Sequence, residues 1–196
     1  MKTIVINPIG EAGSGKSTFS LWLTQALKMR GVVAEYVPEV IKSEFFTQEN
    51  IDRVNSGKFD HRTLIRQNGF IAPLLGNVEV VVNDGCLPVF QYYWSIRCKP
   101  DHLARLRSHL DLYMERQAVA EHRYVAMTRQ HPYEAVGRCT EEMSHERRTQ
   151  LFSTLDKEFG ILPTPLEAWG DREAFADALA KEVFASRPKP PSRPKP

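Results

Sequence analysis

The sequence predicts an α/β fold, in which a parallel sheet of about five strands is flanked by helices. Through most of the 196 residues, short apolar runs alternate with longer segments of helical periodicity. The run Val78–Asn83 is rich in β-branched residues and has the length of a strand that is buried on both faces. A chain of this length fits one domain, and strands that alternate with helices pair in parallel through right-handed crossovers.

The first predicted strand, Thr3–Ile6, leads into a glycine-rich loop, and a helix begins near Thr18. The loop fits the pattern G-x-x-x-x-G-K-[ST], whose glycines permit positive φ and turn backbone N–H groups inward around an anion. The sequence therefore predicts a phosphate-binding loop (P-loop) for a nucleoside triphosphate, made by Gly10, Glu11, Ala12, Gly13, Ser14, Gly15, Lys16, Ser17 and Thr18.

Two side chains of this loop carry the predicted chemistry. Lys16 brings a mobile positive charge to the β- and γ-phosphates. Ser17 offers a hydroxyl to Mg²⁺ in the first helical turn, where the helix dipole also favours anions. The predicted cofactors are ATP and Mg²⁺. The alternative is a glycine-rich turn that binds nothing, but the strand, loop and helix context favours a nucleotide site.

The second strand is predicted over Val32–Val37, after a helix that ends at Arg30-Gly31. The apolar face of that helix comprises Phe19, Leu21, Trp22, Leu23, Ala26, Leu27 and Met29. Pro38 closes the strand and delivers Glu39 to the sheet edge where ligands bind in open parallel sheets. Glu39 is therefore a candidate site residue, and an exposed acid at a helix N-terminus is the alternative.

Helices predicted over Glu44–Asn55 and His61–Leu75 precede the third strand, and Asp84 lies at the tip of that strand. A hydrophobic strand that ends in an acid is the expected partner of a P-loop. Its carboxylate can orient Mg²⁺ or accept a proton from a substrate hydroxyl. Asp84 is therefore predicted to be catalytic and to hold the metal, with a turn-forming aspartate as the alternative. Gln67 is either solvated or faces a cleft.

The next helix is predicted over Pro88–Trp94, and its aromatic cluster favours core packing over a base-stacking platform. Asp101 is predicted to cap a helix that runs to about Gln117. The fourth strand is predicted over His122–Met127. Residues 128–140 are polar and broken by proline and glycine, which predicts a lid that closes over the phosphates.

Arg129 and Arg138 are the arginines of this lid that could steady the charge developing during phosphoryl transfer, unless they are ordinary surface arginines. Thr140 is predicted to cap a helix that ends near Phe159. A short last strand is predicted within Leu162–Trp169, and a final helix begins after Asp171.

We expect a P-loop domain over residues 1–185 and a disordered tail over 186–196. The tail contains two copies of the sequence SRPKP, separated by one proline. The chain has a formal charge of +2, and the tail supplies four basic residues and no acid, so the domain itself is slightly acidic. This balance does not indicate a broad basic face for nucleic acid. The tail is either a solubilising appendage or a segment that holds a polyanion or a proline-binding partner.

The three cysteines, Cys86, Cys98 and Cys139, show no metal-ligand spacing, which favours free thiols in a reducing cytoplasm. No apolar run approaches the roughly 18 residues that a membrane span needs, and no apolar leader precedes the first strand. We expect a cytoplasmic protein without a membrane partner.

Two classes of P-loop protein fit poorly. A GTPase would carry N-K-x-D, which is absent from the sequence, and a remodelling ATPase would need a longer chain. The chain resembles the small P-loop kinases, and among them the ribosylnicotinamide-kinase-like, thymidylate-kinase-like and nucleotide kinases common in bacteriophages. The resemblance rests on Gly10–Thr18, Glu39, Gln67, Val81-Val82-Asn83-Asp84 and Tyr133…Gly137-Arg138…Thr140-Glu141-Glu142.

The resemblance implies a phosphotransferase that moves the γ-phosphate of MgATP to a hydroxyl or phosphate of a nucleoside, nucleotide or nucleobase. It implies Asp84 and Glu39 as base or metal organiser, with the choice between them open, and Arg138 on the phosphates. After Asp84 the chain has Gly85-Cys86 instead of the Asp/Glu-Arg-Ser/Tyr run of deoxynucleoside and thymidylate kinases. This departure argues against a conventional free-nucleoside acceptor.

Two alternatives remain open. The chain also resembles phage kinases, similar to thymidylate kinases, that phosphorylate the hydroxymethyl group of 5-hydroxymethyluracil in DNA. In that case modified DNA is the partner. An ATPase switch without a small-molecule acceptor is the alternative from another class.

Overall fold

One parallel sheet of five strands organises the protein, in the spatial order β2-β3-β1-β4-β5. The computed structural model describes residues 2–11, 13–40, 49, 52, 61–96, 99–128 and 145–188. The strands are β1 (Ile4–Ile9), β2 (Ala34–Val37), β3 (Val80–Asn83), β4 (Glu121–Ala126) and β5 (Thr164–Pro165). The predicted α/β class, with a parallel sheet flanked by helices, is confirmed.

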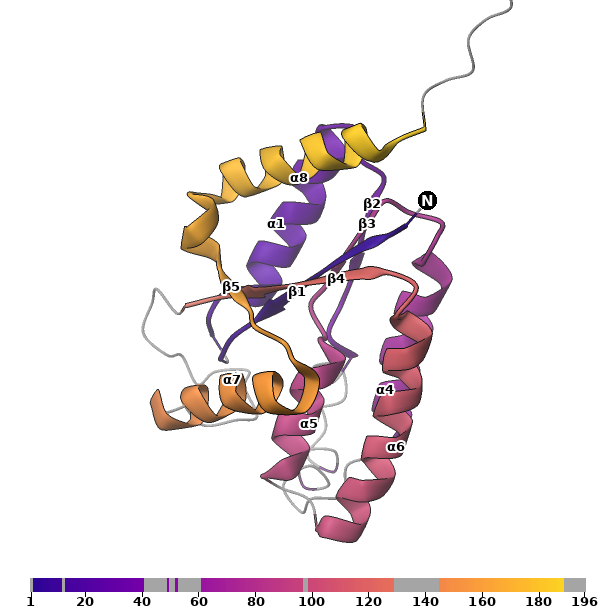
Figure 1. Ribbon diagram of the computed structural model, residues 1–196, viewed down its shortest axis with the longest axis vertical. Coiled ribbons are helices and arrows are strands. Elements are labelled where there is room, and N and C mark those ends of the chain that lie inside the picture. The colour runs from indigo at the N-terminus through magenta and orange to yellow at the C-terminus, as the bar shows by residue number, and fades with distance from the viewer. Residues whose placement is uncertain are drawn as a thin grey trace, which may run out of the picture.

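Helices cover both faces of the sheet. They are α1 (Lys16–Met29), α4 (His61–Ile71), α5 (Leu87–Ser95), α6 (Pro100–Gln117), α7 (His145–Phe159) and α8 (Arg172–Ser186), with short 3₁₀ turns η1 (Ala72–Leu74) and η2 (Leu166–Trp169). Figure 1 shows α1 and α8 together on one side and α4, α5 and α6 grouped on the other. None of the helices in the described part of the chain is long and apolar enough to cross a membrane.

The central strands are buried on both faces, which explains their continuous apolar runs. Ile4 and Ile6 pack with α1 and α8, whereas the intervening Val5 packs with Ile71 at the end of α4. Because β1 lies between β3 and β4, the loop that follows it leaves the middle of the sheet. The P-loop therefore has a neighbouring strand end on each side.

Two predictions about helix ends are wrong in detail. Asp101 is not a cap, because Pro100 occupies the first helical position and Lys99 is the N-cap; proline suits that position since its missing N–H would have no helical partner. The helix predicted to end at Leu75 ends at Ile71 and continues as the 3₁₀ turn η1, which contains Pro73. The short last strand predicted within Leu162–Trp169 is confirmed as β5, which η2 follows.

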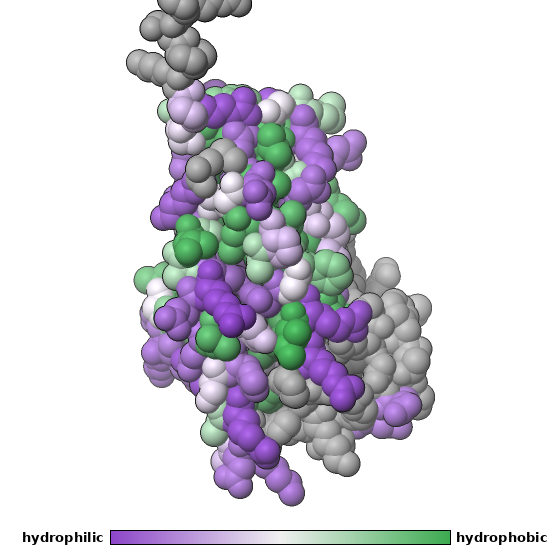
Figure 2. Space-filling model, turned by 90° about the vertical axis from the view of Figure 1, so that its right-hand side faces the viewer, coloured by the Kyte–Doolittle hydropathy of each residue, from purple (hydrophilic) through white to green (hydrophobic). Residues whose placement is uncertain are grey.

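The predicted apolar face of α1 was too wide. Leu21 and Met29 are 54% and 79% exposed, whereas Phe19, Leu23 and Leu27 are fully buried. A helix turns 100° per residue, so positions 21 and 29 lie away from the face that contains 19, 23 and 27. Apolar side chains are also scattered among polar ones on the coloured part of the surface in Figure 2.

Two predictions about side chains are confirmed. Oδ1 of Asp171 accepts a hydrogen bond from Ala174 N at 2.8 Å, so Asp171 caps α8. In the aromatic cluster of α5, Phe90, Tyr92 and Trp94 are at most 3% exposed, which supports the core interpretation. The predicted helix Glu44–Asn55, apart from two of its residues, and the start of the helix after Thr140 lie outside the described residues.

The end of α8 is tied to the domain by Arg187. Its guanidinium donates to both carboxylate oxygens of Glu79, at 2.6 and 2.8 Å, and to Gly31 O at 2.9 Å. The Glu79 side chain is only 5% exposed and also accepts from Val33 N. The described chain reaches Pro188, three residues beyond the predicted boundary, and the rest of the tail lies outside the described residues.

Replacing Arg187 with alanine should lower the free energy of unfolding, because the buried Glu79 carboxylate would lose its charged partner. The hydrogen bonds from Arg187 lower the pKa of Glu79 from its ordinary value. A lowered carboxyl pKa stabilises the fold above the ordinary glutamate pKa, and this contribution disappears as the pH falls through the lowered value. Urea unfolding at pH 7 and in acid measures both effects.

Two truncations provide the matched control for this prediction. A chain that ends at Pro188 keeps Arg187 and should have the stability of the full chain. A chain that ends at Ala185 loses Arg187 and should behave like Arg187→Ala. Equal stability of the two truncated chains would contradict the role given to Arg187.

Candidate active site

The backbone of the P-loop requires glycine at three positions. Gly13 and Gly15 have φ of 85° and 84°, in the left-handed region that favours glycine. A Cβ on Gly10 would lie 2.5 Å from Met127 O and 2.7 Å from Ser14 Oγ. Gly10 therefore lets the loop pass directly against the end of β4. Ala12 lies outside the described residues.

Lys16 begins α1 and folds back across the loop. Its Nζ donates to Gly10 O and to Glu11 O, both at 2.8 Å. Ser17 and Thr18 follow in the first helical turn, Ser17 half-buried and Thr18 exposed. The ammonium of Lys16, the helix N-terminus and the Ser17 hydroxyl thus meet at the loop, which is the arrangement that binds phosphates in P-loops.

Asp84 lies beside the P-loop because β3 is the neighbour of β1, with Ile6 opposite Val82. The side chain is 3% exposed. Asp84 N donates to Val37 O at 2.9 Å, and the Tyr36 hydroxyl lies 3.4 Å from Oδ2. The carboxylate is therefore held between the ends of β2 and β1, as expected for an acid at a strand tip.

Glu39 reaches the same edge of the sheet. The residue is half-buried just after β2. Complete burial of the thiol raises the pKa of Cys86 to about 12, and the charge of Glu39 is a smaller cause in the same direction. Glu39 therefore lies within electrostatic reach of the segment that follows Asp84, so the two predicted acids share one edge. Cys86 itself is a buried, unreactive thiol.

Gln67 neither faces solvent nor opens into a cleft, contrary to prediction, because its amide is fully buried and hydrogen-bonded. Oε1 accepts from Val40 N at 2.9 Å, and Nε2 donates to Pro38 O and to Asn83 Oδ1, both at 3.1 Å. Gln67 thus fastens the segment that carries Glu39 to the end of β3.

Asn83 and Gly85 both contact the buried amide of Gln67. Asn83 Nδ2 donates to Asn7 Oδ1 at 2.9 Å, which joins β3 to β1 just before the P-loop. A Cβ on Gly85 would lie 2.4 Å from Gln67 Oε1, so a side chain at that position would displace the amide. Close packing against Gln67 therefore favours glycine at position 85, directly after Asp84.

An ion pair within the P-loop was missed by the sequence analysis. Glu11 is 1% exposed, and its Oε1 accepts from Nη2 of Arg148 in the first part of α7 at 2.6 Å. The two residues are 137 positions apart, and nothing in the sequence singles out Arg148. The pairing depends on where α7 docks, which no local pattern encodes.

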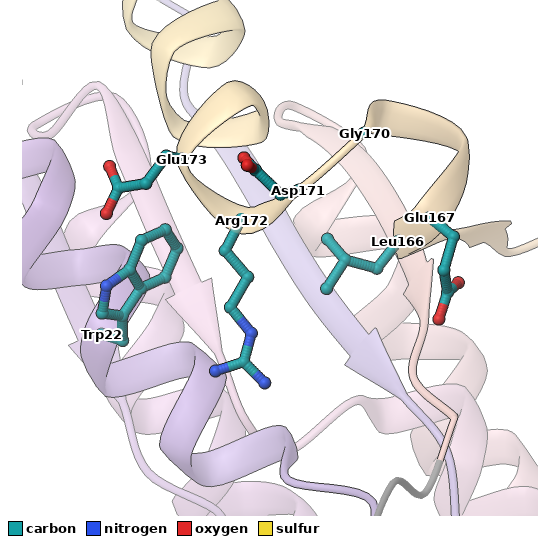
Figure 3. Close-up of a pocket in the computed structure, with 7 residues that line it drawn as sticks. All are labelled: Trp22, Leu166, Glu167, Gly170, Asp171, Arg172 and Glu173. Carbon is teal, nitrogen blue, oxygen red and sulfur yellow. The ribbon is translucent and has the colours of Figure 1, made fainter.

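A cavity of about 480 Å³ lies between α1 and the connection from β5 to α8. Figure 3 shows the Arg172 side chain extending between Trp22 and Leu166. The lining comprises Trp22, Leu166, Glu167, Gly170, Asp171, Arg172 and Glu173. Glu167 Oε1 accepts from the Thr128 hydroxyl at 3.0 Å, and the neighbouring Met127 lies against Gly10. The rim of the cavity therefore connects to the P-loop through the end of β4.

The two predicted site arginines, Arg129 and Arg138, lie outside the described residues. The arginine-bearing lid therefore stays a prediction. Among the described residues, no group of three or more acid, histidine or cysteine side chains could hold a metal ion. Mg²⁺ is commonly bound through one or two carboxylates together with substrate phosphates and water, so the metal site expected at Ser17 and Asp84 needs no such group and stays a prediction.

The fold and the loop geometry define a P-loop protein with a parallel α/β sheet. No protein-family model and no curated protein matches the sequence. Among solved structures, a NadR protein in complex with NR superimposes with a TM-score of 0.60 at 17% identity, over 97% of this chain and 54% of that chain.

A NadR protein in complex with NAD and AMP-PNP gives a TM-score of 0.57 at 17% identity, over 97% of this chain and 52% of that chain. A thymidylate kinase from Ehrlichia chaffeensis superimposes with a TM-score of 0.49 at 17% identity, over 94% of this chain and 100% of that chain. The chain thus spans about half the length of the NadR chains. At these identities the likeness shows the fold alone.

Proposed function

We propose that this protein is an ATP-dependent phosphotransferase that moves the γ-phosphate of MgATP to a hydroxyl or phosphate of a nucleoside, nucleotide or nucleobase. The observation that carries the proposal is the P-loop, in which Lys16 bridges Gly10 O and Glu11 O, beside a buried acid, Asp84, at the tip of the adjacent strand. The NadR structure with AMP-PNP, which shares this fold, supports a nucleoside triphosphate as the ligand.

In the proposed reaction the phosphates of ATP lie along the loop. Lys16 donates to their oxygens in place of the two loop carbonyls and offsets the charge of a loose transition state. Ser17 and Asp84 would hold Mg²⁺, which supplies further positive charge at the phosphates. Either Asp84 or Glu39 accepts the proton of an acceptor hydroxyl, since both carboxylates lie at this edge of the sheet.

The cavity between α1 and η2 is proposed to hold the nucleobase of ATP. It has the volume of a small-ligand site, and its rim touches the end of β4 next to the P-loop. The indole of Trp22 and the guanidinium of Arg172 are flat groups on which a base can stack.

Replacing Trp22 with alanine should raise KM for MgATP about tenfold with little change in kcat, because base stacking contributes binding in both ground and transition states. Trp22→Phe should give a smaller increase. Leu21→Ala is the matched control, since Leu21 is 54% exposed on the same helix. Steady-state kinetics measures these effects, and an unchanged KM for Trp22→Ala would place the base elsewhere.

The acceptor is tested with γ-labelled ATP, Mg²⁺ and a panel of nucleosides, nucleoside monophosphates, ribosylnicotinamide, ordinary DNA and DNA that contains 5-hydroxymethyluracil. Label on a free nucleoside or nucleotide identifies a metabolic kinase. Label on the modified DNA alone identifies a DNA base kinase, for which the phosphate contacts would depend on salt. Label that appears only in free phosphate overturns the kinase proposal in favour of an ATPase switch.

A further inference from the structure

Glu11 places a negative charge inside a loop that is proposed to receive a triphosphate. Its side chain is 1% exposed, so solvent screens the charge poorly. A buried carboxylate that faces phosphates would oppose their binding unless a cation accompanies it. The ion pair with Arg148, at 2.6 Å, supplies that cation.

The position of Arg148 is fixed by the packing of α7. Leu151 and Leu155 are fully buried in a cluster with Ile9, the last residue of β1 before the loop. The Tyr92 hydroxyl of α5 donates to the backbone oxygen of Arg147 at 2.9 Å. These contacts hold the first turn of α7 over the P-loop, so Arg148 reaches Glu11 from a docked helix.

The ion pair with Glu11 does not use all the N–H donors of the Arg148 guanidinium. It carries five N–H groups in a planar fork, and one nitrogen, Nη2, is bonded to Glu11. Its Nε is buried and has no hydrogen-bond partner within the described part of the chain. A buried donor without an acceptor is costly, and phosphate oxygens match the geometry of the fork.

We propose that Glu11 is a positioning residue, whose carboxylate holds the guanidinium of Arg148 at the P-loop so that the remaining N–H groups of Arg148 bind a phosphate of the nucleotide. This inference rests on the proposed function. The ion pair of Glu11 and Arg148 carries no net charge, so the P-loop keeps its attraction for a polyanion. The salt bridge also orients the guanidinium of Arg148 toward the phosphates.

A double-mutant cycle separates the two roles of Arg148. Arg148→Ala should lower kcat/KM for MgATP about 10²-fold, because it removes a phosphate ligand together with the positive charge that Arg148 places beside Glu11. Glu11→Gln should lower kcat about tenfold with a smaller change in KM, because the guanidinium keeps its charge and loses its orientation. The double variant should recover part of the loss in KM and none of the loss in kcat.

Three further measurements complete the experiment. Arg147→Ala is the matched control on the same turn of α7 and should leave kcat and KM unchanged. Added guanidinium ion should restore part of the kcat of Arg148→Ala, which a purely structural defect would not allow. Arg148→Lys keeps the charge, and thermal melting of each variant shows whether the fold is retained.

If the double variant had the kcat and KM of the unmodified protein, Arg148 would only neutralise Glu11. That result would overturn this inference and leave the proposed function standing. Failure of the proposed function gives a different result. In that case the unmodified protein neither binds AMP-PNP nor turns over ATP, and both proposals fall together.

Discussion

Replacing Lys16 with alanine is expected to lower ATP turnover by at least about 10³-fold while the fold is retained. In the proposed reaction its ammonium is the charge that the P-loop places on the transferred phosphate, and it already lies 2.8 Å from two loop carbonyls. The rest of the loop geometry depends on glycine backbone angles and on α1, which Lys16→Ala does not alter. Release of labelled phosphate or product, together with thermal melting, measures the result.

Lys28→Ala is the matched control for Lys16. Lys28 is on the same helix, and its salt bridge with Glu35 joins two side chains that are each about half exposed. Such exposed pairs contribute little, so turnover and stability should stay within error of the unmodified protein. Normal turnover by Lys16→Ala would contradict the P-loop assignment.

Replacing Asp84 with asparagine is expected to lower Mg²⁺-dependent transfer by about 10²–10⁴-fold, because the amide can neither accept the acceptor proton nor balance the metal charge. The substitution preserves size, and the hydrogen bond from Asp84 N to Val37 O involves only backbone. The fold should therefore persist. Initial rates over a range of Mg²⁺ concentrations measure the loss.

Two controls accompany the Asp84 prediction. Tyr36→Phe removes the hydroxyl that lies 3.4 Å from Oδ2 and should change the rate only slightly, since the carboxylate remains. Glu39→Gln tests the second acid at the same edge. A mild defect in Asp84→Asn together with a severe defect in Glu39→Gln would transfer the role of base to Glu39.

The P-loop was predictable because its signals are local. Gly13 and Gly15 take the positive φ that only glycine adopts readily, and Lys16 and Ser17 follow at fixed spacing. Asp84 was predictable for the same reason, because it directly follows a strand rich in β-branched residues. The structure places it beside the loop. The sheet could be anticipated for the same reason, since periodicity reports which segments are strands.

Contacts between distant segments were decided by tertiary structure. Gln67 has the same local sequence whether it faces solvent or the interior, and only the docking of α4 against β3 buries its amide beside Asn83.

By itself the sequence determined the α/β class and the backbone geometry of the glycine-rich loop, because both depend on residues close together in the chain. Only the tertiary structure decided that Arg148 joins Glu11 across 137 positions and that Trp22 lines a cavity with Arg172. Such pairs form when helices dock on a twisted sheet, and the energy of docking is spread over many buried side chains. No short stretch of sequence carries that information.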